Sequence, residues 1–514
     1  MNFKISERFK AVLTSILVTF AIYTGALFIF LYVQGWRVDL LDQSIKQVGV
    51  LTVDSSPSPA DIYVDGEIRG RTARSMTLDV GKYDLRVSRD GFYDWNKEVN
   101  IVEEKSTPVS AYLIRTEFDE ESIFQSDLTL ENYWVDKNNN HLLMLLNDGT
   151  TVRLLHHNIN TGFWALNSTP LTILEINSDI EDPITTLDLQ LSPSGEKAIL
   201  HIITETSDSK YVIPTTRVSQ YEDMIDTPLP LSEFANYTLT WANDENFLML
   251  ESDADVISYN LERNTKHLLY RKVDELDVWS TDQDGYFYIF RNNTGAEENI
   301  LTYSLEQYNL DGSGKTTVIP NIYFQSNEEF INTYRESEFK FSYFTNSPEN
   351  TQTIGEITDF IVKQELTGIY IETTQATYWY NSTTGKYITV SAYPSEVIQF
   401  SPDGDKVLIT TNEQYKVFIL DKEEGDHTVT IGTQPINNLN SDLVSDIHWL
   451  SNSRYYQFEE DGFIYISDID GDNKTPILES EGLTYWTVTS SREELVTLTE
   501  TEDTGIVIKS YTIH

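Results

Sequence analysis

The chain has 514 residues, enough for about two to four domains, and its 36 lysines and arginines against 81 aspartates and glutamates give a net charge of −45. A surface this acidic repels phosphate backbones, so nucleic acid is a poor partner. Cysteine is absent. Its absence excludes disulfides, zinc–thiolate sites, iron–sulfur clusters and thiol nucleophiles, and it favours a bacterial protein, since secreted eukaryotic domains of this size usually carry disulfides.

The first distinctive segment is the uncharged run of residues 11–33, which follows the basic residues Lys4, Arg8 and Lys10. As a helix this run would rise about 35 Å, which is enough to cross the hydrocarbon core of a bilayer. Basic residues belong on the cytoplasmic side of a membrane. The sequence therefore predicts a cytoplasmic stub over 1–10, then a single-pass transmembrane helix with all later residues outside the cell membrane.

The alternative is a cleaved signal peptide. The apolar run exceeds the ~7–15 residues of a signal core, and no A-x-A-like triplet follows it. We therefore favour an uncleaved anchor, followed by a polar linker over 34–46.

From residue 47 the pattern changes to short alternating runs separated by turn residues such as Asp65–Gly66 and Asp90–Gly91. Alternation of this kind is typical of β-strands, and an Asp-Gly pair between two runs is a strong hairpin signal. Six or seven short strands fit into residues 47–115, with no helical pattern among them. We predict a small antiparallel β-sandwich there.

Within this segment four motifs resemble the PEGA domain. They are Ser55-Ser56-Pro57-Ser58-Pro59-Ala60, Tyr63-Val64-Asp65-Gly66, Gly81-Lys82-Tyr83, and Gly91-Phe92 with Trp95. Ser58 and Pro59 replace the Glu and Gly of the family's name tetrad, and Pro59 can still occupy a turn. The resemblance implies a non-catalytic module of the cell envelope.

Residues 116–514 contain a repeated unit: an apolar pair, a Trp or an equivalent, small polar turn residues and two hydrophobic strands. Eight units are centred on Trp134, Leu191, Trp241, Trp279, Ile361, Phe400, Trp449 and Trp486. Most intervals are 37 to 57 residues, close to the length of a β-propeller blade. The Ser401-Pro402-Asp403-Gly404 turn and its near copy Ser192-Pro193-Ser194-Gly195 resemble blades of TolB-like, WD40-like propellers.

The fold class is therefore an all-β ectodomain, a sandwich plus a seven- or eight-bladed β-propeller, behind one transmembrane helix. Eight blades is our choice, and the gap between Trp279 and Ile361 holds an insertion or a hidden blade around 330–344. The last unit supplies three strands. A closed ring needs a fourth, which 123–130 could provide from the N-terminal side.

Catalytic motifs are missing from the sequence: it has no G-x-S-x-G, P-loop, G-x-G-x-x-G or H-E-x-x-H. Of eight histidines only His156 and His157 are adjacent, and neighbours on a strand point to opposite faces, so we expect no chelate. The metal candidate is a segment with oxygen ligands at calcium-loop positions 1, 3, 5 and 12. These ligands are Asp468, Asp470, Asp472 and Glu479. The segment is also a plain outer turn of a blade, since Asn473 replaces the expected Gly and strands flank it.

These features predict a membrane-anchored envelope protein whose propeller binds a protein or a cell-wall polymer without catalysis or a cofactor. The alternative is an extracytoplasmic propeller hydrolase or lyase acting on polysaccharide, because 81 acids offer many carboxylate pairs. The side chains at the ring axis distinguish these two functions. Acids together with His, Arg and aromatic residues favour an enzyme, and a merely acidic rim favours a binding protein.

Overall fold

The computed structural model describes residues 7–33, 36–39, 44–103, 105–159, 169–177, 183–220, 228–229, 236–272, 277–282, 284–293, 300–325, 356–363, 367–382, 386–391, 393–411, 413–421, 432–440, 443–490, 493–501 and 505–514. The chain divides into two compact units. The first is Met1–Phe118 with Lys422–Thr430 and His514, and the second is Asp119–Asp421 with Ile431–Ile513. Each unit is described by itself.

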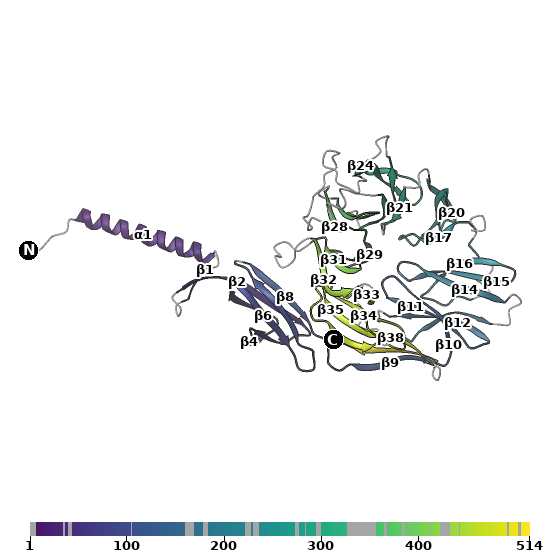
Figure 1. The fold of residues 1–514 in the computed structure, drawn as a ribbon, viewed down its shortest axis with the longest axis horizontal. Coiled ribbons are helices and arrows are strands. Elements are labelled where there is room, and N and C mark those ends of the chain that lie inside the picture. The colour runs from purple at the N-terminus through teal and green to yellow at the C-terminus, as the bar shows by residue number, and fades with distance from the viewer. Residues whose placement is uncertain are drawn as a thin grey trace, which may run out of the picture. The chain divides into compact units, whose positions relative to one another are not determined.

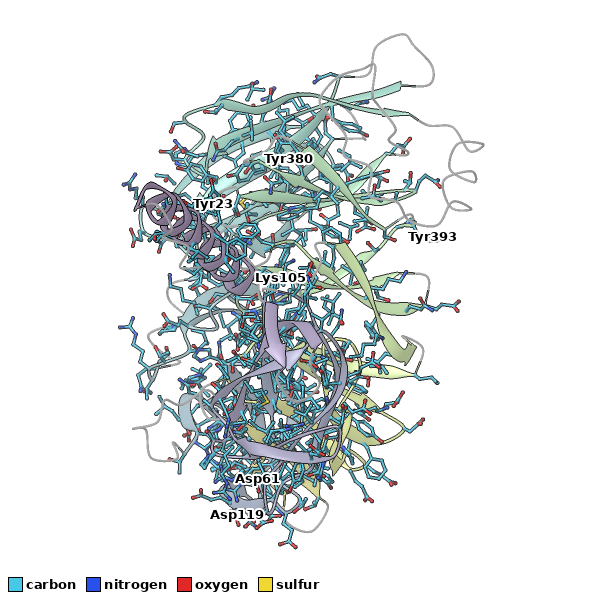
Figure 2. All side chains as sticks on the ribbon, turned by 90° about the vertical axis from the view of Figure 1, so that its left-hand side faces the viewer. Tyr23, Asp61, Lys105, Asp119, Tyr380 and Tyr393 are labelled. Atoms are coloured by element: carbon cyan, nitrogen blue, oxygen red, sulfur yellow. The ribbon has the colours of Figure 1, made fainter. Side chains whose placement is uncertain are left out.

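A helix forms where the sequence predicts one, as α1 over Glu7–Val33. Its described large apolar side chains are all more than half exposed, and Tyr23, labelled on the helix in Figure 2, is 73% exposed. Among the residues that the structure describes, no helix combines the length and the apolar character needed to cross a membrane.

The rest of the first unit is a sandwich of two four-stranded sheets. One sheet has the order β1-β2-β5, with β8 also paired to β2, and the other has the order β4-β3-β6-β7. The strands are β1 Trp36–Asp39, β2 Ser44–Ser56, β3 Asp61–Val64, β4 Glu67–Arg71, β5 Arg74–Asp79, β6 Gly81–Ser88, β7 Trp95–Ile101 and β8 Ser106–Tyr112. Their core includes Leu51, Ile62, Leu85, Trp95 and Ile101.

Two details differ from the sequence prediction. The sandwich is not purely antiparallel, because β2 and β8 run parallel, with Val50 opposite Ser106. The chain crosses from one sheet to the other between β7 and β8, which lets β8 enter beside β2 in the same direction. The predicted linker also contains structure, since β1 pairs with the start of β2, Trp36 lying opposite Gln47.

The second unit contains eight successive antiparallel sheets among its described residues, named sheets 1 to 8 in chain order. Sheet 1 is β10 Thr129–Val135, β11 His141–Asn147, β12 Thr151–Asn158 and β13 Leu171–Asn177; sheet 2 is β14 Ile184–Leu191, β15 Lys197–Thr204 and β16 Asp208–Pro214. Sheet 3 is β17 Thr238–Trp241, β18 Phe247–Glu251, β19 Asp255–Asn260 and β20 Thr265–Arg271; sheet 4 is β21 Val278–Thr281, β22 Tyr286–Asn292, β23 Ile300–Asn309 and β24 Thr316–Gln325.

Sheet 5 is β25 Ile357–Val362, β26 Gly368–Thr373, β27 Thr377–Asn381 and β28 Lys386–Ser391; sheet 6 is β29 Glu396–Phe400, β30 Lys406–Thr411, β31 Gln414–Ile419 and β32 Gly432–Asn440. Sheet 7 is β33 Val444–Trp449, β34 Tyr455–Glu460, β35 Phe463–Asp468 and β36 Thr475–Glu479. Sheet 8 is β37 Leu483–Val488, β38 Glu494–Thr501, β39 Gly505–Thr512 and β9 Asp119–Ser126.

All eight repeat centres of the sequence lie in the first strand of a sheet, so the prediction of eight units is confirmed within the described residues. The predicted closing strand also forms: β9 pairs antiparallel with β39, placing Phe124 opposite Ile508. An N-terminal strand thus completes the C-terminal sheet. The proposed hidden blade around 330–344 lies outside the described residues.

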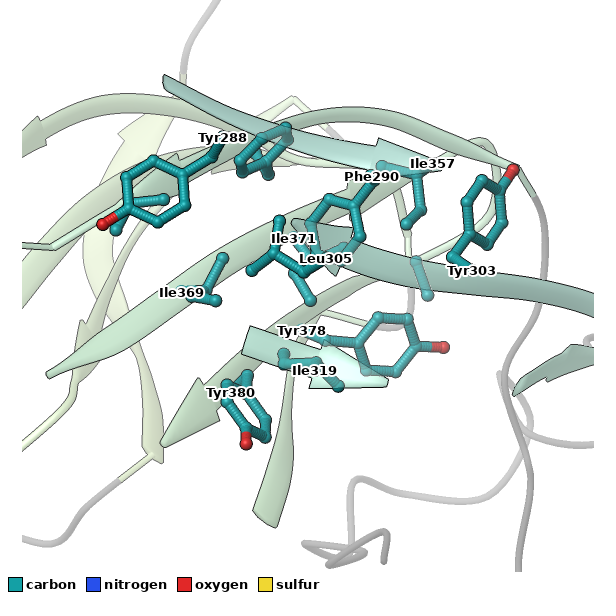
Figure 3. Close-up of a cluster of buried hydrophobic side chains, with 13 residues drawn as sticks. Tyr288, Phe290, Tyr303, Leu305, Ile319, Ile357, Ile369, Ile371, Tyr378 and Tyr380 are labelled. Atoms are coloured by element: carbon teal, nitrogen blue, oxygen red, sulfur yellow. The ribbon is translucent and has the colours of Figure 1, made fainter. Parts of the chain in front are cut away.

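The sheets follow one another around a centre (Figure 1), and none of the sheets formed by the described residues closes on itself. Buried clusters join sheets 1 and 2, 2 and 3, 3 and 4, 4 and 5, 5 and 6, and 8 and 1. Figure 3 shows the cluster between sheets 4 and 5, where Phe290 packs edge-on against Phe360 with ring centroids 4.7 Å apart. This architecture is a β-propeller, in which each sheet buries its faces against two neighbours.

Tryptophans of the repeat add hydrogen bonds between neighbouring sheets. Trp449 Nε1 donates to the Gln399 carbonyl oxygen at 3.1 Å, which joins sheets 7 and 6. Trp241 Nε1 donates in the same way to the Gln190 carbonyl oxygen at 3.0 Å. The remaining repeat tryptophans donate to carboxylates of a neighbouring sheet: Trp134 to Asp188, Trp279 to Glu251 and Trp486 to Glu459.

We predict that W449A lowers the free energy of unfolding by about 3–5 kcal/mol, because it removes a buried indole that is only 7% exposed and leaves a cavity between two sheets. Urea titration followed by fluorescence and circular dichroism measures the loss. The control is F463A in the same sheet, where the side chain is 37% exposed and the expected change is within about 0.5 kcal/mol. Equal effects of the two variants would contradict the inter-sheet role.

Candidate functional site

The first strand of each sheet is the edge strand nearest the ring axis. First strands of neighbouring sheets contact one another, as β10 with β14, β21 with β25 and β29 with β33, and in Figure 1 β29 and β33 lie closer to the middle of the ring than β32. None of the eight first strands, as the structure bounds them, contains a lysine or arginine, and one contains a histidine. Five carry a carboxylate: Glu131, Asp188, Asp359, Glu396 and Asp446.

Local backbone geometry fixes several of these positions. The pairing of first and second strands shifts register at Glu131 in sheet 1 and beside Asp359 in sheet 5, whereas Asp188 pairs regularly with His201 in sheet 2. The carboxylates of Asp188 and Asp359 each accept a hydrogen bond from the next backbone N–H, at 2.8 Å and 2.7 Å. A bulge re-aims a side chain relative to a regular strand. The bulges therefore hold the carboxylates of Glu131 and Asp359 near the start of their inner strands.

The same end of the ring carries the hairpins between second and third strands. In the sequence, none of these eight connections contains a lysine or arginine. Described acids within them include Asp148, Glu205, Asp253, Glu413 and Asp461. We call the inner-strand carboxylates and these hairpins together the acidic end of the propeller. By contrast, the turns between first and second strands include Lys137, Lys363 and Arg454.

Two carboxylates of the acidic end, Asp359 and Glu396, influence a third one beside it, Glu372. Glu372 in β26 is the cross-strand partner of Asp359 in β25, and Glu396 begins β29 of the next sheet. Loss of solvent around Glu372, then the negative charges of Asp359 and Glu396, raise the pKa of Glu372 to about 7. Desolvation also raises the pKa of Asp359, against the hydrogen bond from the Phe360 N–H. We call these three residues the carboxylate trio.

Further titratable groups lie in sheets 6, 7 and 8, on β31, β33 and β37. Burial raises the pKa of Tyr415, and the charges of Asp446 and Glu396 act in the same direction. Burial lowers the pKa of His448 while Asp446 opposes that shift. Burial raises the pKa of Tyr485, which also senses Asp446. The inner strands therefore carry carboxylates together with Tyr485 and His448, and no arginine.

The predicted calcium ligands occupy a turn. Asp468 ends β35, its backbone N–H donates to the Asp472 carbonyl oxygen at 3.0 Å, and Gly471 N–H returns to the Asp468 carbonyl oxygen at 2.9 Å. Asp470 Oδ1 accepts the Asp472 N–H at 3.1 Å, and Glu479 ends β36 opposite Phe463. No group of three or more His, Asp or Glu among the described residues is placed to hold a metal ion. The contacts at these residues are those of a blade turn.

Sequence reasoning missed a histidine pair. His141 Nδ1 and His156 Nε2 lie 2.8 Å apart, joining β11 and β12. The two residues are 15 positions apart across a hairpin, and only the strand register reveals that they meet, with His156 opposite Leu143. The sequence analysis considered only the adjacent residues His156 and His157, whereas the residue that His156 contacts is His141.

Comparison with known proteins gives one family match, to the PEGA domain over residues 48–117. No curated protein matches the chain. Among solved structures, Porphyromonas gingivalis dipeptidyl peptidase 4 aligns at 12% identity and a TM-score of 0.43, over 76% of this chain. This chain spans 58% of the length of that peptidase.

Two further solved structures align with similar sequence identities and TM-scores. A eukaryotic initiation factor aligns at 12% identity and a TM-score of 0.40, over 82% of this chain and 93% of its own. The WD40 domain of SCAP from fission yeast aligns at 10% identity and a TM-score of 0.37, over 77% of this chain and 98% of its own. The propeller architecture rests on the ring of sheets described above.

We predict that E372Q stabilises the protein at pH 8 and has little effect at pH 4. The pKa of Glu372 is raised in the folded state, so its contribution to stability is complete below the unfolded value near 4.5 and is lost as the pH rises through about 7. After allowance for solvent screening, the gain at pH 8 is about 1–2 kcal/mol. Thermal melts across this range measure it. A gain that is equal at both pH values would contradict the raised pKa.

Proposed function

We propose that this protein is an extracytoplasmic binding module whose propeller binds a cationic partner at its acidic end, without catalysis. The observation that carries the proposal is the charge of the first strands, which hold five carboxylates and no lysine or arginine. Strand ends and loops are where propellers and other rigid folds present binding groups. The PEGA match over 48–117 supports a place in the cell envelope.

Charge is concentrated in the propeller. Residues 118–514 contain 22 lysines and arginines against 66 aspartates and glutamates, whereas residues 48–117 contain 9 against 12. An acidic field of this kind attracts cations and repels anionic polymers. The partner is therefore a protein with a basic patch or a wall polymer that bears ammonium groups. The sandwich, which is close to neutral, is proposed as a stalk or wall contact.

A binding experiment tests the partner chemistry. The full chain in detergent is titrated with oligolysine and with purified wall fragments at increasing salt. We expect affinity to fall steeply above ~0.15 M salt, where the Debye length drops below about 8 Å. Replacing the carboxylate trio (D359N/E372Q/E396Q) should weaken binding about tenfold or more, because the charges of Asp359 and Glu396, and the ionised fraction of Glu372, act on the same ligand.

The control variant, E67Q/E103Q/E117Q, removes three carboxylates from exposed positions of the first unit. It should leave the affinity nearly unchanged if the acidic end is the binding surface. Equal losses in both triple variants would show a general effect of net charge, and the site assignment would fail.

A second candidate function, a polysaccharide hydrolase or lyase, is favoured by one observation. Glu372, with a pKa of about 7, is paired across strands with Asp359. A carboxyl kept protonated near neutral pH beside a second carboxylate is the arrangement of a general acid with its partner. Incubation of the chain with wall fragments and glycans, followed by mass spectrometry, decides between the two. Turnover that E372Q abolishes would establish the enzyme.

We also propose that residues 11–33 anchor the protein in the cell membrane with the later residues outside. The support is the uncharged sequence after Lys4, Arg8 and Lys10, and the exposed apolar side chains of α1, among them Phe20 and Tyr23. Protease treatment of intact cells should remove the C-terminal epitope while a cytoplasmic marker survives. Protection of the epitope until lysis would refute this topology.

A further inference from the structure

The histidine pair found in sheet 1 is a buried titratable group that the proposed function does not use. His156 is 7% exposed, and its ring centroid lies 5.1 Å from that of His141 with the ring planes 18° apart. Since the nitrogens are only 2.8 Å apart while the centroids are so distant, the rings meet edge to edge. The contact is an N–H···N hydrogen bond in line with both rings.

This pair lies at the junction between sheets 1 and 2. His141 begins β11, and its backbone N–H donates to Asp136 Oδ1 at 2.5 Å, which closes the β10–β11 turn. Gly195, in the turn of sheet 2, packs against the His141 ring so closely that a Cβ there would lie 2.6 Å from His141 Cδ2. The Thr215 hydroxyl holds that turn by donating to the Gly195 carbonyl oxygen at 2.5 Å. The His141 ring therefore lies between β12 and the next sheet.

The charges around the pair determine how it responds to acid. Asp136 is the carboxylate beside His141, and its oxygens accept the backbone N–H groups of Asn138, Asn140 and His141. His157 on the same strand opposes a charge on His156. On the sheet 2 side, Glu196 is exposed and Lys197 Nζ donates to the Glu245 carbonyl oxygen at 3.0 Å.

The number of protons on the two imidazole rings determines whether the hydrogen bond between them can form. When both rings are neutral, or when one of them carries an extra proton, one ring nitrogen donates and the other accepts, so the hydrogen bond forms. With both rings cationic, two N–H donors face each other at a buried position, and the bond is lost. Burial and the neighbouring histidines His141 and His157 lower the pKa of His156 to about 4, so the second proton arrives only in acid.

We propose that the His141–His156 pair is an acid-sensitive joint between sheets 1 and 2, which is closed while at most one ring is charged and opens when both are. Opening frees the β10–β11 turn and the Gly195 contact and leaves the other sheet junctions intact. The proposal is independent of the partner that the acidic end binds.

Hydrogen exchange of the full chain, followed by mass spectrometry from pH 7 to pH 4 and corrected for intrinsic rates, tests this joint. We expect protection in β11, β12 and residues 192–197 to fall by up to roughly 100-fold, as the shift from 6.5 to about 4 implies. H156Q should abolish this response, because the Gln side-chain oxygen accepts the His141 N–H and does not titrate. The matched control H201Q changes a half-buried histidine that pairs with Asp208 in sheet 2, and it should behave as the wild type.

An identical acid response in wild type and H156Q, or a response spread equally over all sheets, would overturn the proposal. If H156Q fails to fold, the imidazole nitrogen-15 shifts of the wild-type chain decide instead. His156 should remain neutral until about pH 4. Titration of His156 at its ordinary value near 6.5 would equally overturn it.

Discussion

Each sheet of the propeller depends on burying its two faces against the sheets on either side. The tryptophans of the repeat show this most directly, since each carries its indole into a junction and donates its N–H to the neighbouring sheet. Two pairs are geometrically equivalent: Trp241 and Trp449 bond to a glutamine carbonyl oxygen, while Trp279 and Trp486 bond to a glutamate. A sheet removed from the ring would expose both apolar faces and leave these donors unpaired.

Closure of the ring follows from the same constraint. Sheets 8 and 1 share a core that includes Leu142, Val496 and Ile508, so the last sheet must be complete to cover the first. Strand β9 completes it, and Lys509 forms an ion pair with Glu120 along that pairing at 2.8 Å. Because β9 comes from the N-terminal side, the two ends of the propeller sequence are held in one sheet. An open ring would leave β39 as an unpaired edge.

The sequence predicted the parts of the fold that repeat. The repeat centres from Trp134 to Trp486 mark first strands, because a motif that recurs at blade spacing indicates the same strand of each blade. The fourth strand of the last sheet, near Phe124, was predicted because the last unit supplies only three strands. The sequence did not predict the carboxylate trio, because Asp359, Glu372 and Glu396 have no regular spacing and one acid among 81 has no distinguishing neighbour. Only cross-strand register and sheet adjacency bring these groups together. The parallel β2–β8 pair escaped prediction for the same reason, since it joins distant segments.

Packing between sheets also explains where function can reside. The sheet faces are committed to the core, as with Tyr288 and Phe360, each 1% exposed, so the strand ends remain for binding. At one end, acids of the turns are used by the backbone: Asp403 accepts hydrogen bonds within its own turn. At the other end, Glu372 of the carboxylate trio is not held by a turn in this way. Its raised pKa means that folding costs free energy at neutral pH, either to protonate the carboxylate or to keep its charge in the folded state. A group that costs stability where packing does not require it is typical of a functional site, since selection retains such a residue for what it binds.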